Sequence, residues 1–284
     1  MNPSAPTGSS YPALSDLLDL VPSGAGTFTA VSPPGGATGR LFGGQLVAQA
    51  LRAAGLTAPR GAHPYQLHAQ FLRAGRPYEP LTLHTWSPRD GRAFANRQVT
   101  VEQHGKPVLA LLASFHTGEP GDDLQPSYDA GPHPDSLPPW PSPLDNGAAM
   151  SAFELRPACP PKAGGRPALH PLWLRAKEPL PGDALVHACA QAFASDFGLA
   201  LSARWERPDP DAFTTVSLDH SVWFHRPAPA TRWLLLSTKT MSVANGRCLV
   251  HGCLHTTRGE LVATIAQVAL LRRAGTADDR STMD

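Results

Sequence analysis

The chain has 284 residues, 42% of them hydrophobic, and its 24 Lys and Arg against 23 Asp and Glu give a net charge of +1. The length fits about two domains, each with enough apolar residues for a core. The near-neutral charge argues against a nucleic-acid-binding protein, which normally carries a basic stripe. The apolar runs fall short of the roughly 20 residues that span a bilayer, and four cysteines do not form a disulfide scaffold.

We recognise neither a secretory nor a peroxisomal targeting signal in this sequence. The first twelve residues lack a basic region followed by an apolar stretch, so they do not resemble a secretory signal. The last four residues, Ser-Thr-Met-Asp, differ from the peroxisomal Ser-Lys-Leu signal. We therefore expect a reduced, cytoplasmic protein without nucleic-acid or membrane partners.

The first segment predicts one helix followed by four antiparallel strands. Gly43-Gly44 opens an Ala- and Leu-rich helix that runs to about residue 54. Gly75, Asp90-Gly91 and Gly105 separate the apolar runs that follow, as turn residues separate strands. The predicted strands cover residues 65–73, 79–87, 92–103 and 107–117.

Proline marks the connection between two segments of about 110 residues each. The chain has 31 prolines, which crowd between residue 119 and about residue 171. Because proline lacks a backbone donor and fixes φ, this stretch predicts an irregular connector. We expect a first domain over 10–118, a linker over 119–164, a second domain over 165–274 and a tail over 275–284.

The second segment predicts the same order of elements. Asp183 is a candidate N-cap for a helix over 184–201, in which Leu185, Cys189, Phe193 and Phe197 recur at helical spacing. Four strand-like runs follow, and turn residues separate them. The predicted strands cover residues 214–226, 233–242, 247–256 and 260–272.

The two segments also echo each other in sequence. Phe71-Leu-Arg73 matches Phe224-His-Arg226 at the end of the first long strand, and Gly105-Lys-Pro-Val108 matches Gly259-Glu-Leu-Val262 before the last strand. Such self-similarity indicates a duplicated unit. A helix followed by antiparallel strands, repeated once, predicts the α+β class with two fused helix-plus-antiparallel-sheet units.

Several motifs resemble those of the acyl-CoA thioesterase II family, a fused double hot-dog fold. The resemblance runs from about Leu17 to Arg272 and is interrupted by the linker. The long run from Leu218 to Pro227 is its most specific part. The other motifs are Leu41-Phe-Gly-Gly-Gln45, Phe71-Leu-Arg-Ala-Gly75, Arg89-Asp-Gly-Arg92 and Ala194-Ser-Asp-Phe197.

The resemblance implies hydrolysis of acyl-CoA thioesters to free CoA and a fatty acid, without a cofactor or metal. It assigns catalysis to Asp196, Ser217 and Gln267, which match the family's Asp, its Ser or Thr, and its Gln. The chain departs from the family in having Val268 where Glu is common, and in its proline-rich linker. A carboxylate can take a proton from water while a hydroxyl and an amide hold the water and polarise the carbonyl.

The three positions also allow simpler interpretations from pattern alone. Asp196 lies beside the apolar stripe of its helix, but could be an exposed residue at a fraying helix end. Ser217 alternates with Val216, Leu218 and Val222, which places it on the face opposite to theirs, and a solvated face is common in antiparallel sheets.

Gln267 is more informative, because it interrupts an apolar row that includes Ile265 and Ala269. A buried Gln satisfied by the backbone would give the same pattern. The matching position of the first segment, eight residues beyond the hairpin glycine, is Ala113. Only the second segment therefore carries the amide.

Further residues are candidates for binding the substrate. Gly43, Gly44 and Gln45 form a helix start at which a ligand could approach the backbone, although close packing would also require the glycines. His68, on a first-segment strand, could approach the site as a secondary group. Asp219 is expected to give structural support, because it points to the opposite face from its neighbour His220.

Two other site chemistries are rejected. Cys248, His251, Cys253 and His255 resemble metal ligands, but His251 and His255 would lie ~13 Å apart on one strand, too far for zinc bonds of ~2.0–2.3 Å. No Gly-x-Ser-x-Gly elbow is present, which argues against a serine nucleophile.

Two other functions stay open: a non-hydrolytic acyl-CoA-binding protein and a hot-dog enoyl-CoA hydratase. Such hydratases usually pair His with Asp or Glu, so the Asp, Ser and Gln set argues against that alternative. The resemblance also suggests a homo-oligomer. The preferred acyl chain length is not specified by the sequence.

Overall fold

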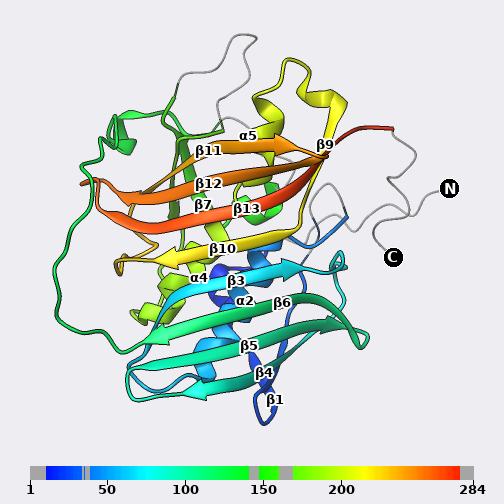
Figure 1. The fold of residues 1–284 in the computed structure, drawn as a ribbon, viewed down its shortest axis with the longest axis vertical. Coiled ribbons are helices and arrows are strands. Elements are labelled where there is room, and N and C mark those ends of the chain that lie inside the picture. Colours follow the sequence, from blue (N-terminus) through cyan, green and yellow to red (C-terminus); the bar gives the residue numbers. More distant parts are fainter. Residues whose placement is uncertain (1–10, 34, 36–38, 141–146, 160–168, 276–284) are drawn as a thin grey trace.

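The computed structural model describes residues 11–33, 35, 39–140, 147–159 and 169–275. Residues 141–146 and 160–164 of the expected linker, 165–168 of the expected second domain and 276–284 of the expected tail lie outside the described residues. Thirteen strands form one sheet, and the longest helices lie against one face of it (Figure 1). The α+β prediction is therefore confirmed.

The first half contains the predicted helix and its four strands, and also a short helix and a hairpin that the sequence did not predict. The elements are α1 (Leu14–Leu18), β1 (Val21–Gly24), β2 (Thr27–Ala30), α2 (Gly43–Thr57), β3 (His63–Phe71), β4 (Leu81–Asp90), β5 (Phe94–Gln103) and β6 (Lys106–His116). Every residue of β1 is exposed, so no burial alternation marked it as a strand.

The second half repeats this order with additions. Its elements are η1 (Pro134–Ser136), α3 (Gly147–Met150), β7 (Phe153–Pro157), β8 (Leu172–Ala176), α4 (Ala184–Ala194), α5 (Leu199–Trp205), η2 (Pro210–Ala212), β9 (Phe213–Ser217), β10 (Asp219–Phe224), β11 (Leu234–Ala244), β12 (Arg247–Thr256) and β13 (Leu261–Arg273). The Asp183 side chain accepts a hydrogen bond from the Leu185 N–H, which confirms the predicted N-cap of α4.

The single helix predicted over 184–201 is wrong, because the chain breaks into α4 and α5. Gly198 precedes α5 with a φ of 72°, a left-handed conformation that ends regular helix. Phe197 in the break is buried like the stripe before it, so the apolar spacing did not reveal the interruption. By length and composition Ala184–Trp205 could cross a membrane, but 67% of its apolar window is buried inside the protein, as in a core helix.

The single strand predicted over 214–226 is also wrong, because it divides at Leu218. On the neighbouring β13, Ser217 pairs with Ala269 but Ser221 pairs with Ala266, so the β9–β10 side carries one extra residue. This β-bulge reverses the alternation of the side chains. Ser217 therefore shares a face with Val222 instead of lying opposite to it, contrary to the sequence prediction.

The proline-rich connector is more ordered than predicted. β7 lies within it and pairs with β8 at the edge of the sheet. Farther upstream, the Gln125 side-chain amide donates to the Gly259 carbonyl and accepts from the Leu261 N–H, as a strand neighbour would. The prediction of an irregular stretch throughout is therefore wrong for residues 153–157.

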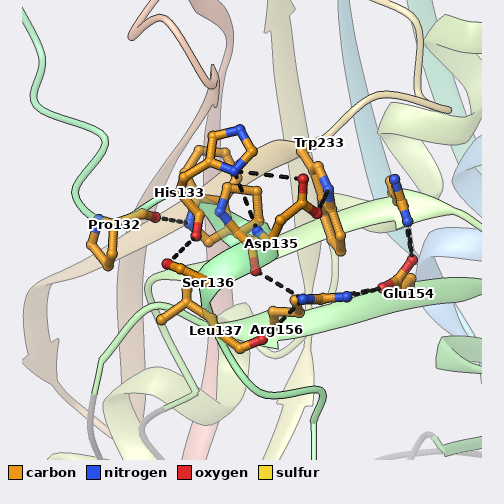
Figure 2. Close-up of polar contacts among 11 residues, drawn as sticks. Pro132, His133, Asp135, Ser136, Leu137, Glu154, Arg156 and Trp233 are labelled. Carbon is orange, nitrogen blue, oxygen red and sulfur yellow. Dashed lines mark hydrogen bonds and ion pairs between the residues drawn. The ribbon is translucent and has the colours of Figure 1, made fainter.

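Side chains also fix this connector to the second half. Figure 2 shows Asp135 accepting a hydrogen bond from the Trp233 indole at 3.2 Å. In the same view Arg156 joins the Leu137 carbonyl to the Glu154 carboxylate, at 2.9 and 2.8 Å. Together these contacts fasten residues 135–137 of the connector to β7 and to Trp233, the residue before β11.

The two halves meet at the centre of the sheet, whose order is β1-β2-β4-β5-β6-β3-β10-β13-β12-β11-β8-β7. β3 and β10 pair antiparallel there, one from each half (Figure 1). α2 and α4 pack against each other in opposite directions, with Gly44 against the Phe193 carbonyl and Gly55 against Leu185. The start of α2 consequently lies at the end of α4.

Candidate active site

A cavity of about 340 Å³ lies where the start of α2 meets the end of α4. Residues from both halves line it, because the two helices run antiparallel across the centre of the sheet. The first half contributes 40–43, Leu46 and 71–75, and the second half contributes Asp196, Gly198, part of α5, 214–218 and Leu270.

Asp196 occupies the turn between α4 and α5, where its carboxylate receives donors from both halves. Its Oδ2 accepts a hydrogen bond from the Gly44 backbone N–H at 2.9 Å, and its Oδ1 accepts one from the Gln267 side chain at 2.7 Å. The residue is only 7% exposed, which excludes a solvated helix end. Burial raises the pKa of Asp196 to about 6, although both hydrogen bonds oppose this shift.

Gln267 connects the carboxylate to the hydroxyl. Its Nε2 donates to Asp196 at 2.7 Å and to Ser217 Oγ at 2.9 Å, which uses both amide hydrogens. Its Oε1 is buried and has no hydrogen-bond partner among the described residues. Gln267 does interrupt the buried face of β13, as the sequence predicted.

Ser217 reaches this group because of the bulge at Leu218. The bulge is held in place by Asp219, whose carboxylate accepts a hydrogen bond from the Val268 N–H at 2.7 Å. The expected supporting role of Asp219 is consistent with this contact. The three residues that the resemblance singled out thus form one hydrogen-bonded group.

His220 is a buried neighbour of Asp196 that the sequence did not single out for the site. Its Nε2 lies 2.7 Å from Ser195 Oγ, and its Nδ1 lies 4.0 Å from Asp196 Oδ1. Burial lowers the pKa of His220 to about 3, so the imidazole is neutral. The two side chains therefore do not form an ion pair at neutral pH.

Gly43 and Gly44 are each required to be glycine, but for different steric reasons. A Cβ on Gly43 would lie 2.7 Å from Asp196 Oδ2, so this glycine keeps the space beside the carboxylate open. A Cβ on Gly44 would collide with the Phe193 carbonyl, so this glycine permits the approach of α4. Both interpretations of the motif apply, each to a different residue.

Gln45 and His68 lie outside the cavity lining. Gln45 is fully buried, accepts a hydrogen bond from the Tyr11 hydroxyl at 3.2 Å and donates to Gln49 at 3.2 Å. His68 Nδ1 lies 3.0 Å from Ser221 Oγ. In this structure both side chains are held by hydrogen bonds to other residues, and their predicted role in substrate binding stays a prediction.

No group of three His, Cys, Asp or Glu side chains is placed to hold a metal ion in the part of the chain that the structure describes. Asp196, Ser217 and Gln267 are joined by hydrogen bonds beside the cavity. A buried carboxylate, a hydroxyl and an amide can orient and deprotonate water.

Comparison with known proteins agrees with the fold. Residues 32–116 match the model of the acyl-CoA thioesterase N-terminal domain, and residues 124–271 match that of the acyl-CoA thioesterase C-terminal domain. Human acyl-coenzyme A thioesterase 8 is 33% identical over 260 residues, which cover 82% of this chain and 81% of that protein. Acyl-CoA thioesterase 2 of Haemophilus influenzae is 30% identical over 82% of this chain and 88% of its own length.

Solved structures resemble the whole chain. The acyl-CoA thioesterase II TesB2 from Mycobacterium marinum has a TM-score of 0.78 at 32% identity, covering 93% of this chain and 99% of that one. A hot-dog protein from Alicyclobacillus acidocaldarius has a TM-score of 0.76 at 20% identity, covering 91% and 97%, and supports the fold alone. The predicted double hot-dog is confirmed. This chain belongs to the acyl-CoA thioesterase family.

Proposed function

We propose that this protein hydrolyses acyl-CoA thioesters to free CoA and a fatty acid, with Asp196 as the general base. The observation that carries the proposal is the buried Asp196 carboxylate, which receives hydrogen bonds from Gly44 and Gln267. Its pKa of about 6 leaves it ionised at neutral pH while making it a stronger base than an exposed aspartate. Membership of the family supports the same reaction.

The proposed reaction begins with a water molecule held beside Asp196. Asp196 takes a proton as the water oxygen bonds to the thioester carbonyl carbon, and the carbonyl oxygen becomes an oxyanion. Ser217 Oγ accepts from Gln267, so its own hydrogen is available to donate to that oxyanion. Collapse of the intermediate breaks the carbon–sulfur bond, and Asp196 returns the proton to the thiolate of CoA.

Gln267 aligns the other two residues in this scheme. It fixes Asp196 and Ser217 through one amide group, at 2.7 and 2.9 Å, so their separation is held by a side chain from β13. Positioning of this kind lowers the barrier without adding a new chemical step. Gly43 leaves space for the water and the thioester beside the carboxylate.

A thiol-release assay with acyl-CoA esters of increasing chain length tests the reaction. We expect release of free CoA, with most turnover lost in Gln267→Ala while its circular dichroism spectrum is retained. Folded wild-type protein that releases no thiol from any ester would overturn the proposal. Binding without turnover would favour an acyl-CoA-binding protein, and addition of water to an enoyl-CoA would favour a hydratase.

A cytoplasmic location and a homo-oligomeric state are further parts of this proposal. All four cysteines are free thiols, which suits a reducing compartment. Cell fractionation tests the location, and light scattering coupled to gel filtration tests the assembly. Recovery in an oxidising compartment, or a monomer at working concentration, would contradict the respective part.

A further inference from the structure

The charged residues around the cavity are unevenly distributed. Three arginines line it, Arg40, Arg73 and Arg204, whereas Asp196 is the one acidic residue among the described residues of the lining. The aliphatic and aromatic lining, which includes Leu46 and Phe71, suits an acyl chain and gives no reason for three guanidinium groups. The arginines therefore need a separate explanation.

The two ends of the cavity can be distinguished by exposure. Asp196 is buried, whereas Leu72 is 45% exposed and its neighbour Arg73 is also exposed. The segment that contains these two residues therefore lies at the mouth, and the carboxylate lies at the closed end. Arg40 is partly buried between these extremes.

The three arginines differ in how many of their guanidinium donors already make contacts within the protein. Arg204 Nε donates to the Pro210 carbonyl at 2.7 Å and its Nη2 lies 3.6 Å from Asp211, which explains it as a support for the loop after α5. Arg73 donates only its Nη1 to the Pro107 carbonyl, at 2.9 Å. Within the described residues, Arg40 has no hydrogen bond or ion pair from its guanidinium.

We infer that Arg40 and Arg73 form a subsite that binds phosphate groups of the CoA half of the substrate. The inference rests on the proposed function, because CoA carries a diphosphate and a 3′-phosphate far from its thioester. A guanidinium presents planar paired donors that match phosphate oxygens. A cationic mouth also attracts a polyanionic substrate and places its neutral thioester end toward Asp196.

The test compares two thioesters with the same acyl group. One is the acyl-CoA, and the other is the acyl-N-acetylcysteamine thioester, which has no phosphate. The quantity measured is the ratio of kcat/KM for acyl-CoA to kcat/KM for the short thioester. We expect this ratio to fall about tenfold in Arg40→Ala and in Arg73→Ala, which corresponds to loss of one charge-assisted hydrogen bond. Most of the fall should come from a higher KM for acyl-CoA.

Arg76 provides a matched control on the same loop. It is 74% exposed and lies 3.7 Å from Glu79, and it does not line the cavity. Arg76→Ala should leave the ratio unchanged. An unchanged ratio in both cavity variants, or an equal fall in Arg76→Ala, would overturn the subsite.

Direct binding separates failure of the subsite from failure of the proposed reaction. Adenosine 3′,5′-bisphosphate carries phosphates of the CoA nucleotide but no thioester, so its binding by calorimetry needs no turnover. We expect its Kd to rise about tenfold in Arg40→Ala. Equal affinity in wild type and variant would refute the subsite, whereas wild-type protein that cleaves neither thioester would refute the reaction alone.

Discussion

The two ends of the α2–α4 helix pair are built differently, although each half contributes one of the helices. Where α2 starts and α4 ends, Asp196 is buried and accepts hydrogen bonds from Gly44 and Gln267. Where α4 starts and α2 ends, Arg52 and Asp183 form an ion pair at 3.0 Å with Asp183 48% exposed. A duplicated frame thus holds a buried carboxylate at one end only.

The strands show the same difference. β13 carries Gln267 on its buried face, and the bulge at Leu218 turns Ser217 toward it. In the first half the matching position on β6 is Ala113, which is fully buried between Leu67 on β3 and Arg97 on β5. The second half therefore carries the three proposed catalytic residues, while the first half contributes the Gly44 donor and part of the cavity wall.

The largest effect is expected from removing the charge at the reactive end. Asp196→Asn keeps the shape, and a flipped Gln267 amide can restore the hydrogen bonds, so the fold should remain. Loss of a positioned base typically costs ~10²–10⁴-fold in rate. We expect a fall of this size in kcat for acyl-CoA hydrolysis, with Asp183→Asn at the opposite end as the control.

Ser217→Ala should have the next largest effect, because it removes the proposed oxyanion donor. Loss of one such donor typically lowers kcat by ~10²–10³-fold. Ser221→Ala removes the hydroxyl that contacts His68 and should change kcat by less than about twofold. Equal losses in the two serine variants would contradict the assignment and would return His68 to consideration.

Burial of the Asp196 carboxylate should also lower the free energy of unfolding at neutral pH. The pKa of Asp196 is raised from 3.8 to about 6 on folding, so the folded state loses stability as pH rises through about 6, by on the order of 2–3 kcal/mol. Urea unfolding should therefore show Asp196→Asn to be more stable than wild type at pH 7. The difference should shrink below pH 4, and a less stable variant at pH 7 would contradict this account.

Gly43→Ala should have a smaller effect on the site. The added methyl group would lie 2.7 Å from Asp196 Oδ2 and 3.0 Å from Phe71 Cζ. The methyl group would displace the Asp196 carboxylate, and a misplacement of ~1 Å can cost ~10²-fold in rate, so we expect kcat/KM to fall by about tenfold. Gly121→Ala, where nothing lies within 4 Å of the added carbon, is the matched control.

The sequence predicted the repeated helix-and-strand frame well, because apolar periodicity reports burial directly. It did not predict the break before α5 or the bulge at Leu218. Phe197 is buried although it lies in the break, as it would be in a continuous helix. The left-handed conformation of Gly198 does not alter the spacing of the apolar residues. A bulge adds one residue to a strand without changing its composition, so the orientation of Ser217 was assigned to the wrong face.

The candidate site was predicted in part. Family resemblance indicated Asp196, Ser217 and Gln267, but the Gly44 donor lies 152 residues from Asp196 in sequence. Such a contact depends on how α2 packs against α4, which local patterns do not specify. For the same reason the sequence did not show that Arg40, Arg73 and Arg204 line one cavity, although Arg73 lies in a family motif.

The most direct test of the central claim, that buried Asp196 is the base, is the pH dependence of wild-type kcat/KM for acyl-CoA hydrolysis, which reports the pKa of the base in the free enzyme. The account predicts that kcat/KM falls about tenfold per pH unit below about 6, where Asp196 becomes protonated. A profile that stays flat down to pH 4.5, in protein that remains folded, would contradict it.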